Sequence, residues 1–242
     1  MTARSVVLSV LLGAHPPSAT AAELLRLTAD FGIKETALRV ALTRMVSAGD
    51  LIRSDGGYRL SERLLVRQRR QDAALTPATR DWDGTWLTVV VTGAGADARD
   101  RALLRMALHH SRFGELREGV WLRPDNLAES LPTEMLPAEI GRRARLLRAR
   151  DEAPAELAVL LWDLPGWSRT GRRLLREMGC AGDIPGRFTV AAAMVRHLLT
   201  DPVLPAGLLP AGWPGDQMRS TYTDFAAHLV SRRDAARLVE AR

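Results

Sequence analysis

The feature that most restricts the fold is a series of three short helical patterns within the first fifty residues. These patterns predict helices over residues 4–13, 20–31 and 34–48. Thr20 and Glu23 form a capping box at the start of the second helix, and Gly32 suits a left-handed helix stop. The link between the second and third helices is therefore as short as a helix-turn-helix requires.

A strand–turn–strand pattern, Leu51–Leu60, follows the third helix directly. Asp55-Gly56 at its centre can adopt the positive φ values of a two-residue hairpin turn. A further helix is expected from about Ser61 to Ala74. Residues 1–80 are therefore predicted to form a winged helix-turn-helix with a linker helix.

The third helix has one apolar face and one polar face. Leu38, Leu42 and Met45 follow helical spacing and are expected in the core. The opposite face is short-chained, hydrogen-bonding and basic, as entry into a DNA major groove requires. The predicted DNA-binding residues on this helix are Lys34, Thr36, Arg39, Val40, Thr43 and Arg44, and those on the hairpin are Arg53 and Arg59.

The charge distribution agrees with a nucleic-acid surface in the first third of the chain. Lys and Arg number 34 against 28 Asp and Glu, and residues 1–80 hold 12 basic and 7 acidic side chains. Lys34 is the only lysine, so the abundance of arginine reflects composition and is not itself evidence of phosphate binding.

Membrane and secretory signals are weak. The longest apolar runs, Val6–Ala14 and Ala155–Trp162, are too short to span a bilayer, which needs about 20 residues. Ala19-Thr20-Ala21 resembles a signal-peptide cleavage site, but the capping box makes folded structure the better interpretation. A cytoplasmic protein is therefore expected.

Residues 81–153 show a β-α-β-β-α-β pattern, which predicts a ferredoxin-like domain. The expected elements are a strand at 85–92, a helix at 98–111, two strands around Glu118-Gly119, a helix at 126–136 and a strand at 143–150. The first strand has no acidic metal ligand near its end, so a role in dimerisation is expected instead of nuclease activity.

Residues 154–242 are predicted to form a third, helical domain. Helices are expected at about 168–178, 188–200 and 216–240. The predicted fold class is therefore α+β and mainly helical.

Five motifs, in order along nearly the whole chain, resemble the PaaX family, the repressors of phenylacetic acid degradation. They are Phe31-Gly32-Ile33 with Arg39, Trp82-Asp83-Gly84-x-Trp86, Gly119-Val120-Trp121-Leu122-x-Pro124, Trp162-Asp163-Leu164, and the segment from Asp201-Pro202 to Trp213-Pro214-Gly215.

The resemblance implies a winged-helix domain, a middle domain like the CRISPR spacer-acquisition nuclease subunit, and a family-specific helical tail. It also implies a homodimeric repressor, without enzymatic activity, that an aryl-acetyl-coenzyme A thioester releases from its DNA operator. The operator is expected to be an inverted repeat.

This chain departs from the family at one run. Where the family has His-Glu-aromatic-Arg-Arg, this chain has Ala192–Arg196, and only Arg196 matches. A changed acyl preference is expected. The predicted effector-binding residues are Trp162, Trp167, Trp213, Arg169, Arg172, Arg173 and Arg196.

Two other functions compete with a regulator. Gly93 and Gly95 lie in a G-x-G-x-x-A pattern after a strand, so a nucleotide-dependent oxidoreductase is the enzyme alternative. No buried second strand ending in an acidic residue follows, so no cofactor is predicted. A protein-interaction adaptor is the other alternative. The five histidines and the single Cys180 do not have metal-ligand spacing, and no metal site is predicted.

Overall fold

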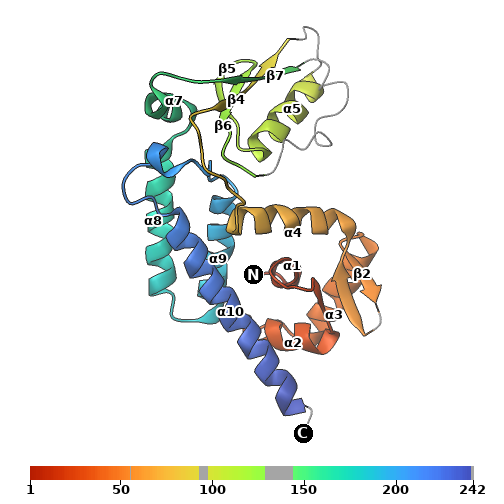
Figure 1. The fold of residues 1–242 in the computed structure, drawn as a ribbon. Coiled ribbons are helices and arrows are strands. Elements are labelled where there is room, and N and C mark those ends of the chain that lie inside the picture. Colours follow the sequence, from red (N-terminus) through yellow and green to blue (C-terminus); the bar gives the residue numbers. More distant parts are fainter. Residues whose placement is uncertain (55, 93–97, 129–143, 241–242) are drawn as a thin grey trace. The chain divides into compact units, whose positions relative to one another are not determined.

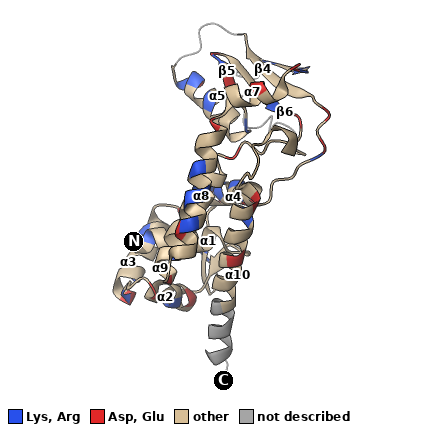
Figure 2. Cartoon of the chain, turned by 90° about the vertical axis from the view of Figure 1, so that its left-hand side faces the viewer, with Lys and Arg blue, Asp and Glu red and all other residues tan. Residues whose placement is uncertain are grey.

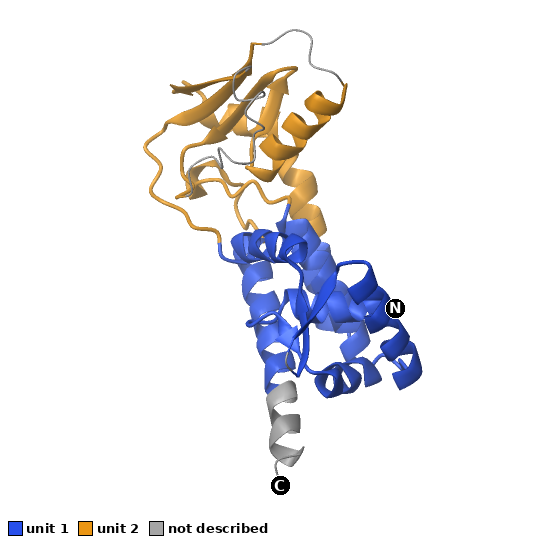
Figure 3. Ribbon diagram, turned by 90° about the vertical axis from the view of Figure 1, so that its right-hand side faces the viewer, with its two compact units in different colours: residues 1–76, 171–199, 215–242 blue, residues 77–170, 200–214 orange. Residues whose placement is uncertain are grey.

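A computed structural model describes residues 1–54, 56–92, 98–128 and 144–240, with the backbone alone for 232–240 (Figure 1). The chain forms two compact units (Figure 3). Unit 1 contains residues 1–76, 171–199 and 215–242, and unit 2 contains residues 77–170 and 200–214. The sequence predicted three consecutive domains with boundaries near residues 80 and 153. The compact units follow other boundaries, because the last two α-helices pack with the N-terminal residues.

Unit 1 begins with a winged helix. Its elements are α1 (Ala3–Leu12), β1 (Ser18–Ala19), α2 (Ala21–Ala29), α3 (Glu35–Ser47), β2 (Leu51–Ser54) and β3 (Gly57–Leu60). The predicted capping box starts α2: the Thr20 hydroxyl accepts from the Glu23 amide at 3.1 Å, and the Glu23 carboxylate accepts from the Thr20 amide at 2.7 Å. Gly32 has φ +66°, the left-handed conformation predicted for it.

The wing is an antiparallel hairpin with Ser54 opposite Gly57, which is the register of a two-residue turn. Gly56 has φ +85°, and Asp55 lies outside the described residues. The short strand β1, which the sequence pattern did not predict, pairs with β3 on its other side. A side chain at Gly57 would lie 2.5 Å from the Ala19 carbonyl oxygen, so this pairing requires glycine there.

The core of the winged helix lies between α1 and α3. Leu38, Leu42 and Met45 of α3 are buried against α1, which confirms the apolar face predicted for this helix. Leu51 and Leu60 close the core from the wing.

Unit 1 also contains α4 (Glu62–Leu75), α9 (Ile184–Leu198), α10 (Gly215–Glu240) and the part of α8 (Leu164–Cys180) from Gly171 onward. Helix α9 contacts both α4 and α10. The Arg219 guanidinium of α10 donates a 3.1 Å hydrogen bond to the Ala74 carbonyl at the end of α4. The C-terminal helices therefore belong to the same compact unit as the winged helix.

Unit 2 contains a four-stranded antiparallel sheet in the order β5-β6-β4-β7. The strands are β4 (Trp86–Val91), β5 (Gly114–Arg117), β6 (Val120–Pro124) and β7 (Ala144–Ala149), and α5 (Ala98–His110) connects β4 to β5. This is the ferredoxin-like strand order with the predicted strands in place. The predicted helix at 126–136 falls mostly outside the described residues.

The two faces of this sheet carry different cores. Leu87 and Val89 of β4 pack with Leu104 and Leu108 of α5. Trp86 faces the other way, toward α7 (Pro154–Leu161) and the short 3₁₀ helix η2 (Ala206–Leu208). The alternation along β4 is the period of two expected for a strand buried on both faces.

Two C-terminal elements differ from the predicted ones. The apolar run after residue 154 is the helix α7, for which no helix was predicted, and α8 begins at Leu164, four residues before its predicted start. Asp163 explains this start, because its carboxylate accepts a 2.8 Å hydrogen bond from the Gly166 amide. Among the described helices, none is long and apolar enough to cross a membrane.

Candidate nucleic-acid interface

Five of the side chains predicted to contact DNA are on α3, and Lys34 precedes this helix as its N-cap residue. Lys34, Thr36, Arg39, Val40, Thr43 and Arg44 are all exposed. Val40 is 51% exposed, an unusual position for a valine in a helix whose other face is buried. A hydrophobic methyl group presented to solvent between basic residues matches the contacts that thymine methyl groups accept in a major groove.

Arg39 is held by an ion pair within α3. Its guanidinium donates to the Glu35 carboxylate one turn earlier, and the Thr43 hydroxyl donates a 3.0 Å hydrogen bond to the Arg39 carbonyl. The Arg39 side chain remains 77% exposed. It is therefore oriented along the helix surface in the absence of DNA, with a carboxylate as its partner.

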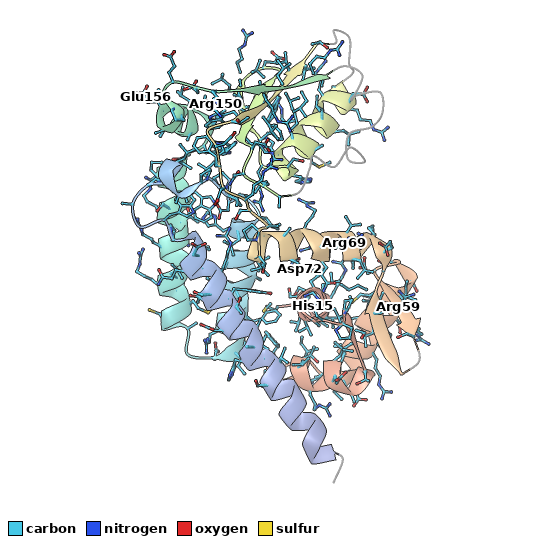
Figure 4. All side chains as sticks on the ribbon, in the orientation of Figure 1. His15, Arg59, Arg69, Asp72, Arg150 and Glu156 are labelled. Carbon is cyan, nitrogen blue, oxygen red and sulfur yellow. The ribbon has the colours of Figure 1, made fainter. Side chains whose placement is uncertain are left out.

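The wing presents two further basic side chains. Arg53 on β2 lies opposite Tyr58, and Arg59 on β3 lies opposite Ile52, so the two arginines occupy neighbouring positions of one hairpin. Both are exposed, and Arg59 is labelled in Figure 4. An exposed hairpin with arginines on both strands suits contacts with phosphates beside a recognition helix.

The predicted effector residues are divided between the two compact units. Trp162, Trp167, Arg169 and Trp213 belong to unit 2, whereas Arg172, Arg173 and Arg196 belong to unit 1. Basic residues follow successive turns of α8 (Figure 2), but Arg173 pairs with Glu177 at 2.8 Å and Arg172 also has an interaction.

The tryptophans of this set are packed against other side chains of unit 2. Trp167 stacks on Trp213 with ring centroids 4.3 Å apart and 11° between the planes. Trp162 stacks on Trp86, with ring centroids 6.4 Å apart. Two stacked pairs of this kind account for the tryptophans as core residues.

The dinucleotide alternative finds no support in the sheet. Both neighbours of β4 run antiparallel to it, whereas a dinucleotide-binding fold requires parallel strands on either side of its first βα turn. Gly93 and Gly95 themselves lie outside the described residues. Within the described ranges, no three His, Cys, Asp or Glu side chains gather as metal ligands do.

Unit 1 contains a cavity of about 120 Å³ that the sequence pattern did not predict. Its walls are the back of α1, one face of α4, and the facing sides of α9 and α10. Of the residues predicted to bind the effector, Arg196 alone lines it. Its other polar lining residues, Ser9, Arg67, Gln71 and Tyr222, come from three helices, α1, α4 and α10, so no local motif indicated them.

Three family models match the chain in order. They are the PaaX-like protein model at residues 2–64, the PaaX protein central Cas2-like domain at 79–161 and the PaaX-like protein C-terminal domain at 187–240. The chain belongs to the PaaX family.

A solved structure, "Uncharacterized protein Rv0674 from Mycobacterium tuberculosis", is 66% identical to this PaaX-family chain. The match covers 98% of this chain and 99% of the other, with a TM-score of 0.86. No curated protein matches. The family supports a PaaX-like transcription regulator. Its tryptophan motifs also have a structural role, because Trp82, Trp86, Trp162 and Trp213 pack in one core of unit 2.

Proposed function

We propose that this PaaX-family protein is a cytoplasmic transcriptional repressor without enzymatic activity. Two copies bind an inverted-repeat operator, and an acyl- or aryl-acetyl-coenzyme A effector releases them. The observation that carries the DNA-binding part is the exposed face of α3, where Arg39, Val40 and Thr43 stand beside a wing with two arginines. Such a face combines phosphate contacts with groups that distinguish base edges.

The dimeric form follows from the size of this surface. A single recognition helix contacts few base pairs, so operator-level specificity needs a second copy. The half-sites are expected to lie about one helical turn apart, ~34 Å, or a multiple of that spacing.

Footprinting and sedimentation test the proposal together. Full-length protein is incubated with the DNA upstream of its own gene and of the neighbouring operons, and the protected region is mapped at several salt concentrations. A two-fold symmetric footprint, a dimer at micromolar concentration and affinity that falls steeply with salt are expected. A monomer that protects a single half-site contradicts the dimer, and the same affinity for all fragments contradicts the regulator.

A further inference from the structure

The cavity in unit 1 lies directly behind the DNA-binding helices. Helix α1 packs one face on α3 through Val7, Leu8 and Leu11, whereas Val10 and Leu12 face the cavity. The far wall comes from α9 and α10, where Phe188 and Phe225 approach edge to face with centroids 6.4 Å apart. A molecule in this space would therefore contact both the helix that supports α3 and the C-terminal helices.

Two polar side chains of the cavity lining make no hydrogen bond to the part of the chain that the structure describes. Gln71 is 7% exposed, and its side-chain amide makes no hydrogen bond within the described part of the chain. Tyr222 also lines the space, and its hydroxyl makes no hydrogen bond to any described side chain or backbone group. Because both groups line the cavity and have hydrogen-bonding capacity to spare, they are available to donate to an oxygen inside it.

The protonation state of Tyr222 suits donation to such an oxygen. Burial raises the pKa of the Tyr222 phenol, and the nearby Asp72 carboxylate raises this pKa further. The hydroxyl therefore keeps its proton at neutral pH. Asp72 itself has a partner, since its carboxylate lies 3.4 Å from the His15 ring nitrogen (Figure 4).

Two arginine side chains give the cavity lining a positive charge. Arg67 on α4 and Arg196 on α9 are both exposed, and neither has a carboxylate partner among the side chains that the structure describes. The charge of Arg67 is close enough to lower the pKa of Arg70, after the larger effect of burial on that group. An anion near Arg67 and Arg196 would relieve this repulsion and gain charge-assisted hydrogen bonds.

The size of the cavity limits what it encloses. A cavity of ~150 Å³ lined by apolar side chains takes up one benzene molecule. The space of about 120 Å³ between Val10, Phe188 and Phe225 therefore holds about one ring or a short branched chain. The nucleotide part of a coenzyme is far too large to be enclosed with it.

Resting on the proposed regulatory function, we propose that this cavity is the effector site. It encloses an aromatic or branched acyl group of about benzene's size, whose carbonyl or carboxylate oxygen accepts from Gln71 and Tyr222. The negative charge of the ligand lies at Arg67 and Arg196. That charge belongs either to the carboxylate of a free acid or to the phosphates of a thioester.

Helix α1 connects the cavity to the predicted DNA-binding surface. Because α1 forms both a cavity wall and the support of α3, a ligand that repositions α1 changes the setting of α3 against DNA. Release from DNA then requires tighter ligand binding to the DNA-free conformation, since only differential affinity shifts the equilibrium.

Calorimetric titration of the full-length protein without DNA tests the site. The probes are phenylacetate, phenylacetyl-coenzyme A and bare coenzyme A. The variants are Arg67→Gln, Gln71→Leu and Ala226→Leu, the last of which fills the cavity from α10. Arg69→Gln is the matched control, because Arg69 lies on the same helix but pairs with Glu62. Circular dichroism establishes that each variant folds, and Arg196→Gln provides a surface substitution if Ala226→Leu does not fold.

Binding of the acid or of the thioester, weakened roughly ten- to a hundredfold by Arg67→Gln and unchanged by Arg69→Gln, supports the proposal. Which of the two probes binds more tightly identifies the source of the negative charge. The proposal is overturned if neither probe binds, if bare coenzyme A binds as tightly as the thioester, or if Arg67→Gln and Ala226→Leu leave binding unchanged. DNA binding is measured separately, so these outcomes leave the proposed regulator intact.

Discussion

The guanidinium of Arg4 donates a 2.8 Å hydrogen bond to the carboxylate of Asp50, which lies 46 residues later in the chain. Asp50 is only 2% exposed, and Arg63 of α4 donates to its other carboxylate oxygen. One buried carboxylate therefore joins α1, the end of α3 and α4. These are the elements that position the predicted recognition helix.

Removing the charge of Asp50 should destabilise the winged helix. Asp50→Asn keeps the shape of the side chain but leaves two guanidinium groups without an anion, and we expect a loss of about 1–3 kcal/mol in the free energy of unfolding. Urea denaturation measures it. Asp224→Asn, an exposed aspartate of α10, is the control and should change the free energy of unfolding by less than about 0.5 kcal/mol. Equal unfolding curves for wild type and Asp50→Asn would contradict this role.

The Glu35–Arg39 ion pair should weaken DNA binding. We expect Glu35→Gln to raise operator affinity roughly two- to fivefold, because it frees Arg39 and removes a negative charge facing phosphate. Arg39→Ala should cost about 1–3 kcal/mol on the operator and reduce discrimination at one base pair. Fluorescence anisotropy with labelled DNA measures both. Glu177→Gln, which breaks the equivalent pair on α8, is the matched control. Weaker operator binding by Glu35→Gln would argue against α3 as the recognition helix.

Arg53 on the wing should contribute affinity without specificity. Arg53→Ala is expected to weaken binding to all sequences alike and to lower the slope of log affinity against log salt by about 1. Salt titrations on operator and unrelated DNA measure this slope. Arg117→Ala, an exposed arginine on β5 of the other unit, should leave the slope unchanged. A sequence-dependent effect of Arg53→Ala would place Arg53 against bases instead.

Trp213 should stabilise unit 2 without binding the effector. Its ring stacks on Trp167, whose indole N–H donates a 3.2 Å hydrogen bond to the Thr200 hydroxyl. We expect Trp213→Ala to destabilise the protein by about 3–5 kcal/mol and to leave ligand affinity unchanged. Thermal unfolding and calorimetric titration measure the two quantities. If the milder variant Trp213→Phe folds but no longer binds the ligand, Trp213 belongs to the effector site after all.

Tyr222 should make stability fall at alkaline pH. Burial and Asp72 raise the pKa of its phenol above the unfolded value, so its contribution is complete below about pH 10 and is lost as the pH rises through the folded pKa. The chain has two tyrosines, so a Tyr58→Phe variant titrates Tyr222 alone by phenolate absorbance. We expect a midpoint above that of the unfolded chain. The same midpoint in urea and in buffer would contradict the environment described for Tyr222.

Much of the local structure was predictable from the sequence. The capping box of Thr20 and Glu23, the left-handed Gly32 and the register of the wing each depend on residues a few positions apart. Buried Leu38, Leu42 and Met45 follow from helical spacing. Helix α7 was missed because its run is apolar around its whole circumference, with Leu160 71% exposed, so it lacks the periodicity that marks a helix.

The tertiary structure alone decided which distant side chains meet. Trp167 and Trp213, far apart in the sequence, stack on each other within unit 2. Arg67 and Tyr222 line one cavity although about two thirds of the chain separates them. Local spacing determines which face of a helix is apolar, but not which helix covers that face, because packing partners are selected by the shape and burial of the whole fold. The exposed and buried faces of α3 could therefore be predicted from the sequence, whereas the cavity required the packed helices.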